Sequence, residues 1–135
     1  MPLTLEIVTP EASVYSDTID SVVIPTVEGE VGILPGHIAL LTQVADGELR
    51  VTKGHETKFL AVAGGFAQVG GDKVRVLAER AITEEKIDEG AVEAALKRAE
   101  QQIADAKNVD PAQFEHLQEM VRFAGVQLAI KRRRR

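Results

Sequence analysis

The stretch from Glu28 to His37, EGEVGILPGH, constrains the fold of this chain more than any other part of its sequence. It contains three glycines and one proline, and the apolar residues between them form a run too short for a helix. Glycine adopts positive φ without strain, whereas proline holds φ near about −65° and donates no backbone amide. The stretch therefore predicts a turn, a short strand and a second turn.

Residues 1 to about 82 carry strand patterns throughout. Apolar and polar residues alternate in 3–7 and in 73–76, and residues 59–63 form a more fully buried apolar run. Turn signals separate such segments at Asp46-Gly47, Gly64-Gly65 and Gly70-Gly71. Many short strands joined by tight turns, with no helical pattern between them, predict an antiparallel β-sandwich or barrel.

The periodicity changes from Asp88 onward. Apolar residues then recur at steps of three and four, Asp88 is placed to cap a first helix, and Asp110-Pro111 forms an N-cap and first helical position for a second. The short connection predicts an antiparallel two-helix hairpin at 84–135, after a β-domain at 1–83. The expected apolar stripes are Val92, Leu96, Ala99, Ile103 and Ala106 in the first helix, and Phe114, Leu117, Val121, Ala124 and Leu128 in the second.

Alanine dominates the first helix of this hairpin, with six alanines between residues 91 and 106. Burying an alanine removes far less apolar area than burying a leucine or isoleucine, which contributes about 1.5–3 kcal/mol. The hairpin is therefore expected to be held by only a few kcal/mol. Two interpretations remain open: a hairpin that separates as a switch, and a hairpin that stays docked and braces the sandwich.

The net charge of −5 is distributed unevenly along the chain. The last five residues, 131–135, carry +5, so the other 130 carry −10. Nucleic acid is disfavoured as a partner, because phosphate binding needs basic residues spread over a surface. An acidic protein surface fits the basic end better, and the plain alternative is a solvated tail that keeps the chain soluble.

Candidate sites for chemistry are few. The chain has no cysteine, which excludes disulfides, thiol nucleophiles and thiolate metal sites. No window approaches the about 20 apolar residues that span a bilayer, so any membrane contact is expected to be peripheral. His37 can be combined with Glu28 and Glu30 as a carboxylate–imidazole metal site, but these residues lie beside glycine turns where polar side chains face water. We expect no metal site and no enzyme active site.

The segments EGEVGILPGH, AVAGGF at 61–66 and VRVLA at 74–78 together resemble, in order and spacing, the epsilon subunit of bacterial F-type ATP synthases, whose mitochondrial counterpart is called delta. The resemblance covers nearly the whole chain. It implies a β-sandwich followed by a helical hairpin, in a non-catalytic rotor subunit of the central stalk. Such a subunit couples proton-driven rotation of the c-ring to ATP synthesis and lies peripherally at the cytoplasmic face of the bacterial plasma membrane.

The resemblance also implies partners and contact residues. The sandwich would contact the gamma subunit and the c-ring, with the turn Glu28, Gly29 and Glu30 meeting the c-ring loops and His37 close behind. The C-terminal helices of relatives can extend and block ATP hydrolysis, with basic residues facing an acidic segment of the catalytic beta subunits. The residues that would fill this role are Arg122, Lys131, Arg132, Arg133, Arg134 and Arg135.

Some members of the family bind ATP in the folded hairpin, through an Ile-Asp-x-x-Arg-Ala motif and arginines on the second helix. Ile87 and Asp88 match this motif, but Ala91 stands where the first arginine is expected. Arg122 matches on the second helix, whereas Val126 occupies the next basic position. Losing a charge-assisted phosphate donor costs about 1.5–3 kcal/mol, so neither tight ATP binding nor another cofactor is expected.

The alternative from a different class is a small β-sandwich ligand-binding module or hydrolase with a helical lid. A hydrolase needs a nucleophile beside a base. Ser13, Ser16 and Ser21 have no histidine near them in the sequence, and only the fold can bring such residues together.

Overall fold

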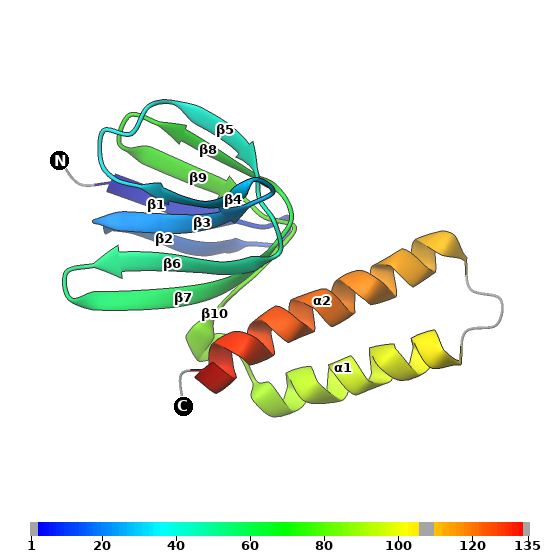
Figure 1. The fold of residues 1–135 in the computed structure, drawn as a ribbon. Helices are drawn as coiled ribbons and strands as arrows, with labels where there is room; N and C mark the ends of the chain where they lie inside the picture. The colour runs from blue at the N-terminus through cyan, green and yellow to red at the C-terminus, as the bar shows by residue number, and fades with distance from the viewer. Residues whose placement is uncertain (1–2, 106–109, 134–135) are drawn as a thin grey trace.

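The computed structural model describes residues 3–105 and 110–133, which form a β-sandwich followed by a helical hairpin (Figure 1). Sheet A has the strand order β2-β1-β9-β8-β5, with β1 at Leu3–Val8, β2 at Ser13–Ile19, β5 at Leu40–Gln43, β8 at Phe66–Gly70 and β9 at Lys73–Leu77. Sheet B has the order β10-β7-β6-β3-β4, with β3 at Ser21–Thr26, β4 at Gly29–Ile33, β6 at Gly47–Lys53, β7 at Glu56–Ala63 and β10 at Arg80–Thr83. The 3-10 helix η1 at Glu84–Lys86 leads to α1 at Glu89–Ala104 and α2 at Pro111–Arg133.

This architecture confirms the predicted sandwich and hairpin, with one difference in strand direction. The paired strands are antiparallel except β1 and β9, which run parallel with Leu5 beside Val74. Parallel neighbours require a connection much longer than a hairpin turn. Local alternation identifies each strand but carries no signal for a pairing across so long a separation.

The main core fills the space between the two sheets. Alternate residues of each strand point inward, so Leu5 of β1, Ile24 of β3 and Leu49 of β6 are fully buried. The apolar run at the end of β7 is covered on both faces of the strand, which explains its burial. Leu60 and Val62 face this core, whereas Ala61 faces outward into a second cluster beneath the hairpin.

The Gly64-Gly65 turn joins β7 to β8, as its sequence predicts. Gly65 has φ +100°, and a Cβ atom built there would lie 1.9 Å from the carbonyl oxygen of Leu77. The close approach of β9 therefore requires glycine at this position.

Local signals placed both helix starts correctly. The Asp88 carboxylate accepts a hydrogen bond from the Ala91 amide at 3.1 Å, and Pro111 is the first residue of α2. Of the predicted stripe in α1, Ala99 is buried and Val92 packs against the second cluster. Leu117, Ala124 and Leu128 are buried in α2, Phe114 is 38% exposed, and Ala106 lies outside the described residues.

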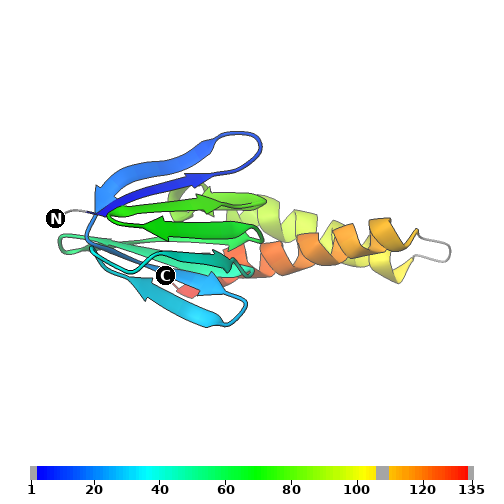
Figure 2. The same ribbon diagram turned by 90° about the horizontal axis from the view of Figure 1, so that it is seen from above.

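Only part of the hairpin contacts the sandwich. The C-terminal half of α2 lies against β7, β6 and η1 of the sheet B side. The C-terminal end of α1 and the N-terminal end of α2 extend beyond the sandwich in both views (Figures 1 and 2). The outer face of sheet A carries no helix in the described part of the chain.

Candidate interaction surfaces

The turn between β3 and β4 is a tight two-residue loop, Val27-Glu28, closed by the pair Thr26 and Gly29. The Thr26 hydroxyl is buried and donates to the Gly29 carbonyl at 2.6 Å, while it accepts from the Glu28 amide at 3.2 Å. Gly29 has φ +114°, which a residue with a side chain rarely adopts. These constraints fix the backbone, so the turn presents its glutamates on a rigid support.

The two glutamates of this turn have different electrostatic surroundings. The Glu30 carboxylate lies 2.9 Å from Nη1 of Arg50, and its side chain is 55% exposed. The Glu28 side chain forms no hydrogen bond or ion pair with any residue that the structure describes. Glu28 therefore offers an unpaired negative charge, and Glu30 a paired but accessible one.

An exposed apolar patch lies on the outer face of sheet A. Phe66 of β8 is directly opposite Leu77 of β9, and the two side chains are 54% and 49% exposed. Leu41 of β5, 71% exposed, lies diagonally across from Phe66 on the same face. Val27 is exposed and lies at the same end of the sheet, because its amide donates a hydrogen bond to the carbonyl of Gln43 at the end of β5. The patch thus borders the acidic turn.

His37 does not lie close behind this turn, contrary to what the family resemblance implies. Gly29 pairs with Thr26 at the end of β3, whereas Ile33 pairs with Val22 at its start. Four steps along β4 cover about 13 Å, and His37 follows in the loop beyond Ile33. That loop instead contacts the β8–β9 turn, where the Gly36 amide donates to Asp72. The strand therefore carries His37 to the opposite end of the sandwich from Glu28 and Glu30.

The hairpin docks through a small apolar cluster. Ala61 of β7, Ile87 before α1 and Ile130 of α2 are buried together. Phe59, Ile82, Val92, Phe123 and Val126 pack around them. The guanidinium of Arg133 also lies 5.2 Å from the centre of the Phe59 ring. The contact is small compared with the core between the sheets.

The basic residues of α2 surround this cluster with polar contacts to the sandwich. Arg122 Nε lies 3.2 Å from Asp46 Oδ2, in the turn between β5 and β6. The Lys131 ammonium donates to the carbonyl oxygen of Glu84 at 3.0 Å.

The next two arginines also bind carboxylates of this chain. Arg132 lies 3.4 Å from Glu89 and 3.5 Å from Glu93, both on α1. Arg133 forms a close hydrogen-bonded ion pair with Glu48 of β6. The acidic surface that the basic end reaches in this structure is therefore its own. Arg134 and Arg135 lie outside the described residues.

The residues that match the ATP motif contribute to hairpin packing and docking in this conformation. Ile87 is buried, the Asp88 carboxylate caps α1, and Arg122 pairs with Asp46. A groove of about 240 Å³ lies between the two helices, but its lining is mostly apolar. The charged residue that borders it is Arg80, from β10. Asp88 and Arg122 are not brought together around it.

The structure gives no support to the hydrolase alternative. Within residues 3–105 and 110–133, no hydrogen bond joins a serine to a histidine. The His116 ring contacts Arg80 at 3.5 Å, and the His37 ring contacts the carbonyl of Ile38 at 2.7 Å.

Neither described helix has both the length and the apolar character needed to cross a membrane. The described residues form an exposed apolar sheet face at one side and a basic helix end at the other. Such surfaces are typical of the class of proteins that act by binding other chains.

Comparisons with known proteins identify the family. A family model described as the ATP synthase delta/epsilon chain β-sandwich domain matches residues 2–84. The ATP synthase epsilon chain of Dehalococcoides mccartyi (strain CBDB1) is 43% identical over 133 residues, covering 98% of this chain and 94% of the relative. That of Prochlorococcus marinus (strain NATL2A) is 40% identical over 108 residues, 80% of each chain. The chain belongs to the ATP synthase epsilon chain family, whose members are non-catalytic subunits of the rotary enzyme.

Solved structures share the same fold. A chain of the Euglena gracilis mitochondrial ATP synthase, from a structure of OSCP, F1 and c-ring in rotational state 1, aligns with a TM-score of 0.76 at 24% identity, covering 96% of this chain and 81% of that one. A chain of the Tetrahymena thermophila mitochondrial enzyme, from its central stalk and c-ring, aligns with a TM-score of 0.62 at 12% identity, covering 97% of both.

Proposed function

We propose that this chain is a central-stalk rotor subunit that couples the c-ring to the catalytic head and restrains ATP hydrolysis through its C-terminal helices. Its sandwich, residues 1–83, would bind the gamma subunit and the c-ring, and residues 84–135 would form the regulatory unit. The site of action would be the cytoplasmic face of the bacterial plasma membrane. Family membership supports this assignment, as do the ATP synthase complexes that contain its structural relatives.

The observation that carries the proposal is the apolar patch of Leu41, Phe66 and Leu77 beside the acidic turn. An exposed apolar patch on a folded domain indicates a contact surface for another protein. We assign this patch to the gamma subunit and the Glu28–Glu30 turn to the polar loops of the c-ring. The hairpin occupies sheet B, which leaves this face of sheet A available for both contacts.

The basic end of α2 supports a regulatory role by competition. In the docked hairpin, Arg122, Arg132 and Arg133 neutralise carboxylates of this chain. An acidic segment of the beta subunits would compete for the same guanidinium groups. The arginine side chains of these ion pairs are about half exposed and the apolar cluster is small, so a partner can supply the free energy needed to separate the hairpin. We therefore favour the switch over the permanently docked brace.

The test is binding of the purified subunit to gamma, with Phe66 and Leu77 both replaced by alanine. We expect affinity to fall at least about tenfold, since a few buried anchor side chains, aromatic ones above all, dominate interfaces. The fold should be unaffected, because both side chains are exposed. The matched control is Leu34→Ala, which removes a similarly exposed leucine from the opposite end of the sandwich. Unchanged binding by the double variant would overturn the assignment of this face to gamma.

A further inference from the structure

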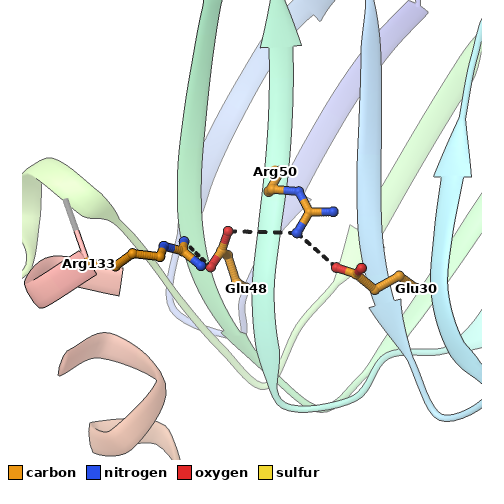
Figure 3. A network of polar contacts seen from close by, with 4 residues as sticks. All are labelled: Glu30, Glu48, Arg50 and Arg133. Atoms are coloured by element: carbon orange, nitrogen blue, oxygen red, sulfur yellow. Dashed lines mark hydrogen bonds and ion pairs between the residues drawn. The ribbon is translucent and has the colours of Figure 1, made fainter. Parts of the chain in front are cut away.

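A row of alternating charges crosses the outer face of sheet B and connects the end of α2 to the acidic turn (Figure 3). Its members are Arg133 of α2, Glu48 and Arg50 of β6, and Glu30 of β4. Arg50 Nη1 lies 2.9 Å from Glu30 and 3.9 Å from Glu48 Oε1, and Arg133 pairs with Glu48 Oε2. Since β3 lies between β6 and β4, the Arg50–Glu30 pair bridges over that strand.

Glu48 is the central member of this row. Its side chain is only 15% exposed, and its Oε1 atom is buried with no hydrogen-bond donor among the described residues. A buried carboxylate depends on nearby cations to offset its desolvation. Among the residues that the structure describes, the cations paired with Glu48 are Arg50 and Arg133, both of the row, so the strength of the Arg133 contact depends on where Arg50 points.

Glu30 determines both the charge of this surface and the position of Arg50. Together Glu48, Arg50 and Glu30 carry −1, which attracts Arg133. If an external cation neutralises Glu30, the surface that Arg133 meets becomes neutral. Arg50 is then free to approach Oε1 of Glu48 more closely than its present 3.9 Å, which brings a second positive charge next to Arg133. Both effects weaken docking of the end of α2.

We infer that this row transmits the state of the Glu28–Glu30 turn to the C-terminal helix, so that a cationic group binding Glu30 loosens the docked hairpin. Glu30 is accessible for such a contact, since more than half of its side chain is exposed. The coupling is a property of this chain alone. Only the identity of the cation, a basic side chain of the c-ring or its neighbours, rests on the proposed function.

The test uses the isolated full-length subunit and a single reporter thiol. The chain has no cysteine, and Ala61 is fully buried beneath Ile130, so Ala61→Cys reacts with a thiol reagent only when α2 separates from β7. In this background Glu30→Gln mimics a neutralised Glu30. The matched control is Glu28→Gln, which removes the same charge from the same turn but from outside the row.

We expect Glu30→Gln to raise the labelling rate about two- to fivefold, the size that a partly exposed ion pair supports. Glu28→Gln should leave the rate unchanged. In a subunit that also carries Arg133→Gln, the effect of Glu30→Gln should disappear, because the group that senses the row is gone. Equal rates for Glu30→Gln and Glu28→Gln would overturn the inference, as would an effect that persists without Arg133. Neither gamma nor the c-ring is present, so these outcomes are independent of the proposed function.

Discussion

Arg122 of α2 and Asp46 of the sandwich are 76 positions apart in the sequence, and their side chains meet with Nε 3.2 Å from Oδ2. The Arg122 side chain is about half exposed, so this ion pair contributes only about 0–1 kcal/mol. The apolar cluster of Ala61, Ile87 and Ile130 must then supply most of the docking free energy. Its small size makes docking of the hairpin weak compared with the core between the sheets, and therefore open to control by partners.

Replacing Ile130 by alanine should therefore undock the hairpin. Truncation of a buried isoleucine costs about 2–5 kcal/mol, which is comparable with the whole docking free energy. Thermal unfolding of the sandwich should change little, because Ile130 lies outside the core between the sheets. Hydrogen exchange resolved by residue would report separately on undocking of the hairpin and on the stability of the sandwich. Phe114→Ala is the control, since it removes a larger side chain from the far end of the same helix, and protection lost equally in both variants would contradict the assignment.

Truncation after Thr83 should leave a folded sandwich. Thr83 ends β10, and the residues of the core between the sheets all precede it. Removing the helices exposes Phe59, Ala61 and Ile82, so solubility should fall before the fold is lost. A cooperative unfolding transition of residues 1–83 is the expected observation. A molten fragment would show instead that the hairpin belongs to the core.

Gly65→Ala should be strongly destabilising. The new Cβ atom would meet the carbonyl oxygen of Leu77 at 1.9 Å, and the backbone at φ +100° is strained for any residue with a side chain. We expect a loss of at least about 2 kcal/mol in the free energy of unfolding. Gly70→Ala is the matched control, because its Cβ would contact nothing within 4 Å, and it should stay within about 0.5 kcal/mol of the parent. Similar denaturant midpoints for the two variants would contradict this prediction.

The ion pair of Asp17 and Lys53 joins β2 of sheet A to β6 of sheet B at 2.9 Å and should make stability depend on pH. The hydrogen bond from Lys53 lowers the pKa of Asp17, and the same bond raises the pKa of Lys53. Because the Asp17 pKa is lower in the folded state, its contribution is complete above the ordinary aspartate value of about 4 and is lost as the pH falls through the folded value. The Lys53 contribution is complete below about 10.4 and is lost at higher pH.

Asp17→Asn should therefore be less stable than the parent at neutral pH, and the difference should vanish in acid. Urea unfolding between pH 2 and 7 measures this difference in stability, because that range includes the ordinary aspartate pKa of about 4. Glu11→Gln is the control, because Glu11 forms no ion pair within the described residues. A stability difference that does not change with pH would exclude the ion pair as its cause.

In the assembled ATP synthase, two sets of substitutions should change ATP hydrolysis in opposite directions. Replacing Arg132 to Arg135 by alanine removes the groups proposed to bind the beta subunits, so hydrolysis should rise. Glu48→Gln weakens docking but leaves those groups intact, so inhibition should strengthen and hydrolysis should fall. Rates must be measured with subunit occupancy confirmed. Equal rates for both variants and the parent would favour the solvated-tail interpretation.

Features with local causes were predicted well. The Asp88 cap and the Pro111 helix start involve groups within four residues of each other, and strand alternation follows from the geometry of one strand. The position of His37 was predicted wrongly, because it depends on the path of a whole strand and not on neighbouring residues. Its nearness to Glu30 was implied by the family resemblance, whereas the extended path of β4 separates them. The assignments of c-ring, gamma and beta contacts remain predictions.

The amino-acid sequence by itself determined which segments form strands, turns and helices, because backbone preferences and apolar periodicity act over a few residues. Only the tertiary structure decided that β1 pairs in parallel with β9, that α2 lies on sheet B, and that Arg133 meets Glu48. Those outcomes depend on which distant surfaces meet as the core closes. An arginine has many possible carboxylate partners, and the partner it meets is fixed by packing of the apolar residues around it.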